Sequence, residues 1–178
     1  MGPNWRISCG PRSNIDLGLD LDACVSVLSF THLPFHARGE YKVPDNWWHD
    51  QGYYNVPLDE FTAAVPAALK KGYSVVFAAD IAVVPSFDIP GAAIDQSSRE
   101  LRFANGSSTD DHVVHCIGLK EGGPGTWFLV KDSWRTAYQG QIKGYFFYRE
   151  DYLKLKVLMI MTHKDAVADL LAKFQPAD

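Results

Sequence analysis

The sequence predicts a globular α+β domain in which one helix precedes a mostly antiparallel sheet. Three observations support this fold class. The chain has 178 residues, enough for one substantial core, and 47% of them are apolar. Residues 58–71 have the apolar spacing of a helix. Residues 112–162 contain four β-prone segments in succession, an order typical of α+β proteins.

The N-terminal part is predicted to be irregular before the folded domain begins. Residues 1–21 are rich in Gly, Pro, Asn and Asp and show no sustained apolar period. We therefore divide the chain into an irregular segment, 1–21, and one domain, 22–178. Residues 23–30 are β-prone and predict a strand. Residues 31–57 are interrupted by prolines and aromatic turn residues, and we expect them to cross the surface.

The central part predicts a helix, a strand and a long loop. Phe61, Val65 and Leu69 recur at helical spacing within residues 58–71, and Gly72 provides a stop signal. Pro66 lies inside this segment and argues against an unbroken helix. The apolar run 73–80 predicts a buried strand. Residues 85–109 are polar and predict a long loop, which in a compact domain is usually functional or mobile.

The C-terminal part predicts the rest of the sheet and a closing helix. Its strands are expected at 112–119, 126–131, 144–149 and 157–162, with a short helical turn at 150–155. Residues 164–174 place Val167, Leu170, Leu171 and Phe174 on one helical face.

Composition argues against several classes of partner and site. A formal charge of −4 offers no electrostatic footprint for nucleic acid or an anionic membrane. The chain has no apolar run long enough to span a bilayer, and its first residues lack the profile of a secretory signal. Cys9, Cys24 and Cys116 are too widely spaced for a disulfide framework or a structural zinc site. We expect Cys24 and Cys116 to be small buried hydrophobes.

A histidine and an aspartate mark the ends of two predicted strands. His112 opens one strand, and Asp132 ends the next, across the turn EGGPG. If these strands form a hairpin, both side chains lie at the same end of the sheet. The carboxylate would then accept the imidazole Nδ1–H and leave Nε2 facing a substrate, with Trp134 excluding water. A solvated edge pair of little energetic value is the alternative explanation.

The segments DDHVVHCIGL, GTWFLVKDSW and GYFFY resemble the C-terminal part of papain-like cysteine peptidases. The bleomycin hydrolase and aminopeptidase C branch is most similar. Its pattern also fits FTHLPFHARGEYKVPDNWW, YYNVPLDEFTAAVPAALKKGYSVVFAADI and MTHKDAV, so the resemblance runs from about residue 22 to 168. It implies the papain-like fold, mainly its antiparallel β half with flanking helices.

The resemblance implies roles for individual residues. His112 matches the general base that pairs with the thiolate, Trp134 the shielding indole, and Asp132 stands where the family has Asn. A carboxylate accepts the same imidazole proton and stabilises the imidazolium more strongly. The family's Gln and nucleophilic Cys, at the start of a long helix, have no counterpart here. Cys9 is the least unsuitable nucleophile, although a proline follows it two residues later.

Other candidate sites are weaker. His112 and His115 are three apart on one strand and point to opposite faces, so they cannot share a metal. His32 and His36 bracket a proline that argues against a chelating helix. We expect no metal or cofactor. The pairs at 47–48 and 53–54 could form a sugar or peptide platform, but packing is the commoner role for such aromatics.

By resemblance, the expected activity is hydrolysis of peptide bonds through a thioester, with removal of N-terminal residues. The expected partners are a peptide substrate and an N-terminal half carrying Cys and Gln; a homo-oligomer and a cytoplasmic location also fit the branch, although some relatives are exported. The alternative is a catalytically inactive peptidase-like module for binding or assembly.

Overall fold

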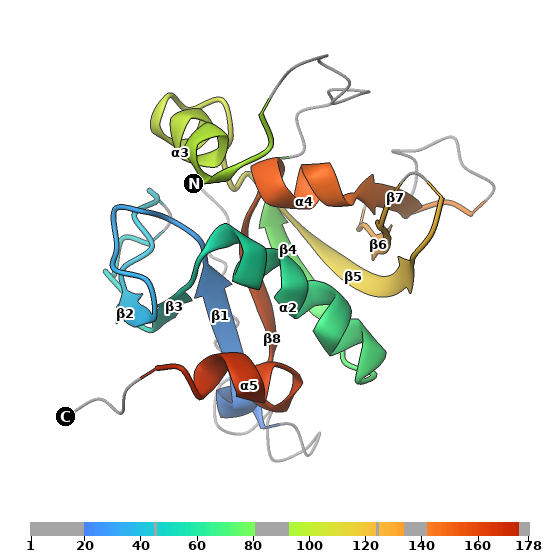
Figure 1. The fold of residues 1–178 in the computed structure, drawn as a ribbon, viewed down its shortest axis with the longest axis horizontal. Helices are drawn as coiled ribbons and strands as arrows, with labels where there is room; N and C mark the ends of the chain where they lie inside the picture. The colour runs from blue at the N-terminus through green and yellow to red at the C-terminus, as the bar shows by residue number, and fades with distance from the viewer. Residues whose placement is uncertain (1–19, 45, 81–92, 124, 134–141, 175–178) are drawn as a thin grey trace.

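The fold is built on one mixed sheet. The computed structural model describes residues 20–44, 46–80, 93–123, 125–133 and 142–174. Within these ranges, eight strands form a single sheet in the order β2-β3-β1-β8-β4-β5-β6-β7, and helices pack around it (Figure 1). The strands are β1 (Cys24–Leu28), β2 (Ala37–Gly39), β3 (Tyr53–Asn55), β4 (Val75–Ala79), β5 (His112–Lys120), β6 (Trp127–Lys131), β7 (Tyr145–Arg149) and β8 (Val157–His163).

All neighbouring strands pair antiparallel except β1 and β3, which pair parallel. This agrees with the predicted α+β class and the mostly antiparallel sheet. All six predicted strands are present with small differences at their ends. Residues 31–57 do not simply cross the surface, because they contain β2 and β3. These three-residue strands are too short to produce an alternating pattern.

The predicted central helix is α2 (Leu58–Lys70), which continues through Pro66. Gly72 follows it with φ +85°, the left-handed conformation that glycine adopts without a Cβ penalty. The expected loop at 85–109 contains α3 (Gln96–Ala104), so that prediction was wrong for this part. Asp95 caps α3 by accepting a hydrogen bond from the Ser98 amide at 2.8 Å.

The remaining helical elements are short. The predicted turn is α4 (Glu150–Lys156). The predicted closing helix is divided into the 3₁₀ helix η2 (Lys164–Val167) and α5 (Ala168–Leu171), and another 3₁₀ turn, η1 (Leu21–Ala23), precedes β1. Of the segment 1–21 that we expected to be irregular, residues 1–19 lie outside the described ranges. Among the described residues, no helix has the length and apolar character needed to cross a membrane.

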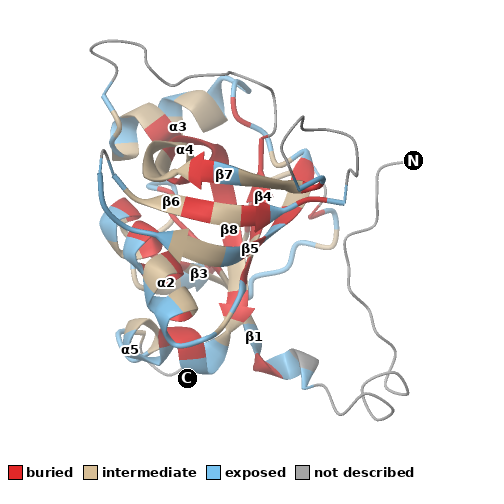
Figure 2. Cartoon of the chain, turned by 90° about the vertical axis from the view of Figure 1, so that its right-hand side faces the viewer, coloured by how far each residue is buried: buried red, intermediate tan, exposed pale blue. Residues whose placement is uncertain are grey.

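Two apolar clusters cover opposite faces of the sheet. The larger packs α2 against the sheet and includes Val27, Phe61, Val65, Phe77 and Val114. The smaller contains Leu28, Phe30, Tyr41 and Leu158, with Phe103 of α3 against it. Successive residues of β1 therefore enter different clusters, as expected for a strand buried on both faces. Figure 2 shows the buried positions concentrated along the strands and on the sides of the helices that face them.

Candidate functional site

Three strand ends meet at one end of the sheet. β5 pairs antiparallel with both β4 and β6, so its first residue lies beside the last residues of its neighbours. Ala79 at the end of β4 is the pairing partner of His112 at the start of β5. Continuing the register that pairs His115 with Lys131 places Asp132 opposite Val114. His112 and Asp132 are therefore diagonal neighbours on the same face of the sheet.

The predicted contact between these two residues is present. His112 Nε2 lies 2.9 Å from Asp132 Oδ1. Both side chains are shielded from water, with 11% of the His112 side chain and 0% of the Asp132 side chain exposed. This burial contradicts the alternative explanation of a solvated edge pair, since such a pair would be held largely in water.

The ring nitrogen that makes the contact differs from our expectation. We expected Asp132 to accept from Nδ1, but the closest pair of atoms involves Nε2. The two residues are diagonal neighbours, whose Cβ atoms lie farther apart than those of a directly opposite pair, and the outer ring nitrogen makes the contact. An ionised carboxylate only accepts hydrogen bonds, so Nε2 carries the proton. In the neutral ring the lone pair is then on Nδ1.

The backbone around Asp132 holds its carboxylate in place. The Asp132 amide donates to the Gly144 carbonyl at 2.8 Å, just beyond the end of the β6–β7 ladder. The Ser133 hydroxyl lies 3.5 Å from Asp132 Oδ1. The contact leaves Nδ1 as the ring nitrogen that does not face Asp132.

The other residues predicted for this site are not placed at it. Trp134 and Cys9 lie outside the described residues. Cys116 is buried on the same strand and the same face as His112, about 13 Å along it at the usual rise of a β-strand. Burial raises the pKa of the Cys116 thiol to about 12, so it is not a thiolate near neutral pH. We expected Cys24 to be buried, but this residue, the first of β1, is exposed.

A chain that lacks a partner half is expected to expose the apolar surface where that half would pack, and the sequence favours the strand face with Val114 and Cys116 for this surface. The structure contradicts this prediction, because that face is buried against the core that includes α2. Large apolar side chains are exposed on the opposite side instead: Ile117 is 40% exposed and Phe147 on β7 is 53% exposed. His115 is exposed and His112 is buried, which confirms that these two histidines point to opposite faces.

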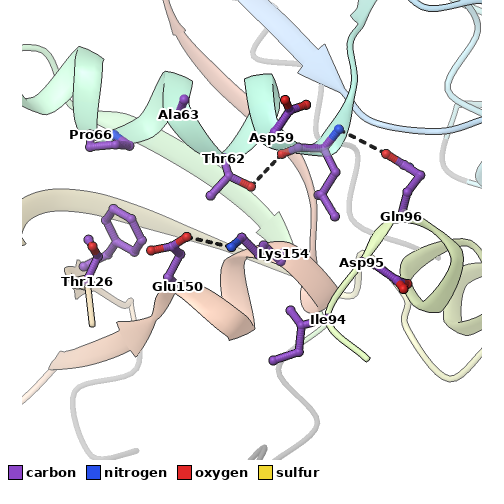
Figure 3. Close-up of a pocket in the computed structure, with 12 residues that line it drawn as sticks. Asp59, Thr62, Ala63, Pro66, Ile94, Asp95, Gln96, Thr126, Glu150 and Lys154 are labelled. Atoms are coloured by element: carbon purple, nitrogen blue, oxygen red, sulfur yellow. Dashed lines mark hydrogen bonds and ion pairs between the residues drawn. The ribbon is translucent and has the colours of Figure 1, made fainter. Parts of the chain in front are cut away.

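A pocket of about 430 Å³ lies elsewhere, between α2, the start of α3, β6 and α4 (Figure 3). Thr126, which lines it, precedes β6, whereas Asp132 follows that strand, so this pocket is separate from the His112 site. Its polar groups are largely bonded to one another or to backbone. Lys154 pairs with Glu150 at 2.7 Å, and Gln96 accepts from the Leu58 amide at 3.0 Å. This pairing indicates a structural role.

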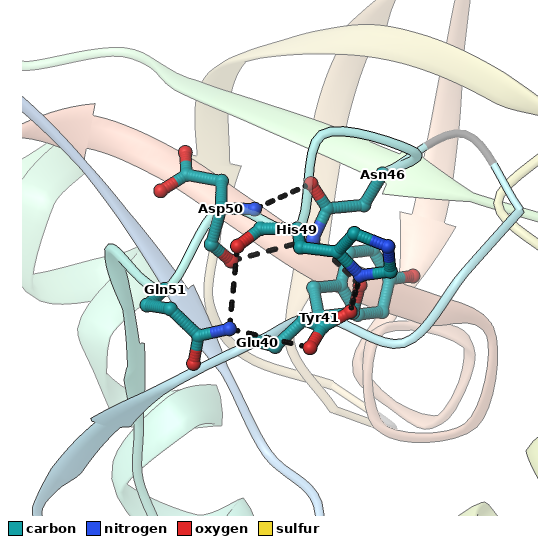
Figure 4. Close-up of polar contacts among 6 residues, drawn as sticks. All are labelled: Glu40, Tyr41, Asn46, His49, Asp50 and Gln51. Carbon is teal, nitrogen blue, oxygen red and sulfur yellow. Dashed lines mark hydrogen bonds and ion pairs between the residues drawn. The ribbon is translucent and has the colours of Figure 1, made fainter.

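A second polar cluster, in the loop before β3, is also structural (Figure 4). Asn46 is buried and bonds the Tyr41 carbonyl at 3.0 Å, while its own amide oxygen accepts from the Asp50 amide at 3.0 Å. His49 Nδ1 lies 2.7 Å from Glu40, and this contact lowers the pKa of Glu40. His32 and His36 are not joined, and His36 instead contacts Glu60 at 3.0 Å. No group of three potential metal ligands occurs among the described residues.

Comparisons with known proteins identify the fold but no closer relationship. No family model and no curated protein matches the chain. A solved structure does match: PepW from Lactobacillus rhamnosis HN001, with a TM-score of 0.68 over 90% of this chain and 18% sequence identity. The matched region is 40% of PepW, so the chain spans about two fifths of that protein's length. At this identity the comparison establishes similarity of fold.

Proposed function

We propose that this chain is the histidine-bearing part of a papain-like cysteine peptidase. The observation that carries the proposal is the buried contact between His112 and Asp132 at the end of the sheet. Two further findings support it. The sequence around both residues resembles the bleomycin hydrolase and aminopeptidase C branch, and the chain shares its fold with PepW.

In this proposal, His112 is the general base for a cysteine thiol. Asp132 holds Nε2–H, so Nδ1 is the nitrogen that accepts the thiol proton and later delivers it to the leaving amine. The resulting imidazolium and thiolate form an ion pair in which Asp132 stabilises the positive ring. The thiolate attacks the peptide carbonyl and forms a thioester, which water then hydrolyses. Trp134, by resemblance, would shield the pair from water.

The nucleophile and the oxyanion donors are proposed to come from an N-terminal half with a Gln and a Cys at the start of a helix. Cys116 is ruled out by its distance along β5 and by its raised pKa. The chain matches only 40% of PepW, which leaves the rest of PepW without a counterpart here. The substrate is proposed to be a peptide from which N-terminal residues are removed.

The test is to determine the intact mass of the protein from its native source and to assay that product with aminoacyl-coumarin substrates. We expect a longer chain that carries the Gln and Cys segment and shows thiol-dependent turnover. Substituting His112→Ala in that product should lower kcat by at least about 10³-fold, because the general base and nucleophile act as a unit. Asp132→Asn should retain more activity than Asp132→Ala, since the amide oxygen can still accept from Nε2–H.

A native product that consists of this chain with no preceding Gln and Cys segment and shows no turnover would contradict the proposal. That result would favour a catalytically inactive peptidase-like module. Turnover that survives His112→Ala would also contradict it, because the proposed mechanism has no other group to activate the thiol.

A further inference from the structure

We infer that a buried ion pair between Asp80 and Lys156 positions His112 at the end of the sheet. The inference deepens the proposed function and rests on it, since it assigns two positioning residues to the proposed catalytic histidine. Neither residue was singled out by the sequence. Asp80 ends the apolar run YSVVFAAD, and Lys156 interrupts the apolar run before β8.

The first step of the argument is the burial of the pair. Lys156 Nζ lies 2.6 Å from Asp80 Oδ2, and the two side chains are 4% and 5% exposed. Charges are rarely buried to this extent, because each loses its hydration. Apolar residues of similar volume are often as stabilising as a buried ion pair, so we assign this pair a role in fixing one particular arrangement of the chain.

The second step is the way Asp80 is held. Its amide donates to the Lys156 carbonyl at 3.1 Å, and its own carbonyl accepts a hydrogen bond from the Tyr152 hydroxyl. Together with the ion pair, these contacts fix the backbone and the side chain of Asp80. The preceding residue, Ala79, pairs with His112 on one side and with Val157 on the other. Fixing Asp80 therefore fixes the strand end against which His112 lies.

The third step concerns the segment that leads into His112. Lys156 Nζ also donates to the Ser107 carbonyl, five residues before His112. The next residue, Ser108, is buried, and its hydroxyl lies 3.4 Å from the Leu155 carbonyl. The Lys156 ammonium group therefore bonds both the residue that follows β4 and the segment that precedes β5. These two contacts fix the strand beside His112 and the path of the chain that leads into His112.

The experiment measures the His112 ring directly by ¹⁵N NMR of the imidazole. In the wild-type chain we expect the Nε2–H tautomer, with a downfield proton from the bond to Asp132. In the double variant Asp80→Leu/Lys156→Met, the buried charges are replaced together so that neither is left unpaired. We expect the downfield signal to broaden or disappear while the far-UV circular dichroism is retained. A loss of general stability alone would not alter this signal in the folded protein.

The matched control is Lys70→Met/Glu121→Leu, which removes an equally short ion pair of 2.6 Å between exposed side chains. We expect the control to leave the His112 signal unchanged. A folded Asp80→Leu/Lys156→Met variant with the wild-type His112 signal would overturn the inference.

If that double variant does not fold, native-state hydrogen exchange on the wild-type chain provides the test. The Asp80 and Ser108 amides are bonded to the Lys156 and Arg102 carbonyls. We expect both amides to exchange through the same opening, with similar protection factors. A Ser108 amide that exchanges through a separate, easier opening would overturn the inference. Neither measurement depends on turnover, so failure of the positioning role and failure of the proposed peptidase function are distinguishable.

Discussion

At the scale of single residues, the candidate site depends on which strand positions His112 and Asp132 occupy. The two residues are not directly opposite each other, because the register places Asp132 beside Val114. Their contact is diagonal and uses Nε2, the ring nitrogen farther from the backbone. The same strand periodicity puts Cys116 on the face of His112 but too far along β5 to be its nucleophile.

The two described cysteines differ in their exposure to solvent. Cys24 is exposed and Cys116 is buried. Iodoacetamide should therefore modify Cys24 in the folded chain near neutral pH, whereas Cys116 should react only after unfolding, as measured by peptide mass spectrometry. Equal labelling of Cys116 in the native and denatured chains would contradict this environment.

Because the pKa of Cys116 is raised in the folded chain, its contribution to the free energy of unfolding decreases as the pH rises. The unfolded thiol loses its proton near its ordinary pKa of about 8.5, while the folded thiol keeps it until about 12. Unfolding therefore releases a proton between these values, so this contribution to stability is present below the lower pKa and is lost as the pH rises. Cys116→Ala should reduce the fall in stability measured between pH 8.5 and the highest pH at which the chain remains folded.

At the scale of secondary-structure elements, α3 is a helix whose sequence lacks the periodic apolar residues by which helices are predicted. The residue of α3 that is fully buried is Arg99, which is charged. Its guanidinium donates to four backbone carbonyls, those of Ser29, Lys154, Val157 and Leu158, at 2.6 to 2.9 Å. It also lies over the rings of Phe30 and Phe61. Burial lowers the pKa of Arg99 to about 10, so the group remains charged at neutral pH.

Arg99→Met should destabilise the chain by at least about 3 kcal/mol, because several buried carbonyls lose their donor at once. Urea unfolding followed by circular dichroism would measure this change. Arg102→Met is the matched control: it makes the same substitution at a partly exposed position of α3 and should have an effect within about 0.5 kcal/mol. Similar effects of the two substitutions would show that Arg99 does not anchor α3.

At the scale of the whole molecule, the described chain has a core on both faces of its sheet. The larger apolar cluster buries the β5 face with Val114 and Cys116. The exposed apolar side chains of Ile117 and Phe147 lie on the outer side of β5 and β7. The chain shares its fold with two fifths of PepW. A core of this extent does not require that the chain carry every residue of a catalytic site.

The 178-residue chain alone should show background hydrolysis of aminoacyl-coumarin substrates. His112 has no described thiol to activate, and catalytic groups that act as a unit lose nearly all of their effect when one is missing. Initial rates with and without a thiol reductant would measure this. Thiol-dependent turnover that disappears in both His112→Ala and Cys9→Ala would contradict the prediction and would make Cys9 the nucleophile.

The sequence by itself determined the long elements and the pairing of His112 with Asp132. α2 and the longer strands have apolar periods set by their own geometry, and the short connection between β5 and β6 makes a hairpin with His112 and Asp132 at its open end. The tertiary structure alone decided the short strands β2 and β3, the helix α3 and the choice of Nε2. These features depend on partners distant in sequence: Asn55 bonds the backbone of Phe30 and Leu33, and Arg99 bonds the start of β8. The buried pair of Asp80 and Lys156 is of the same kind, since residues 76 apart meet only when β4 and β8 lie side by side.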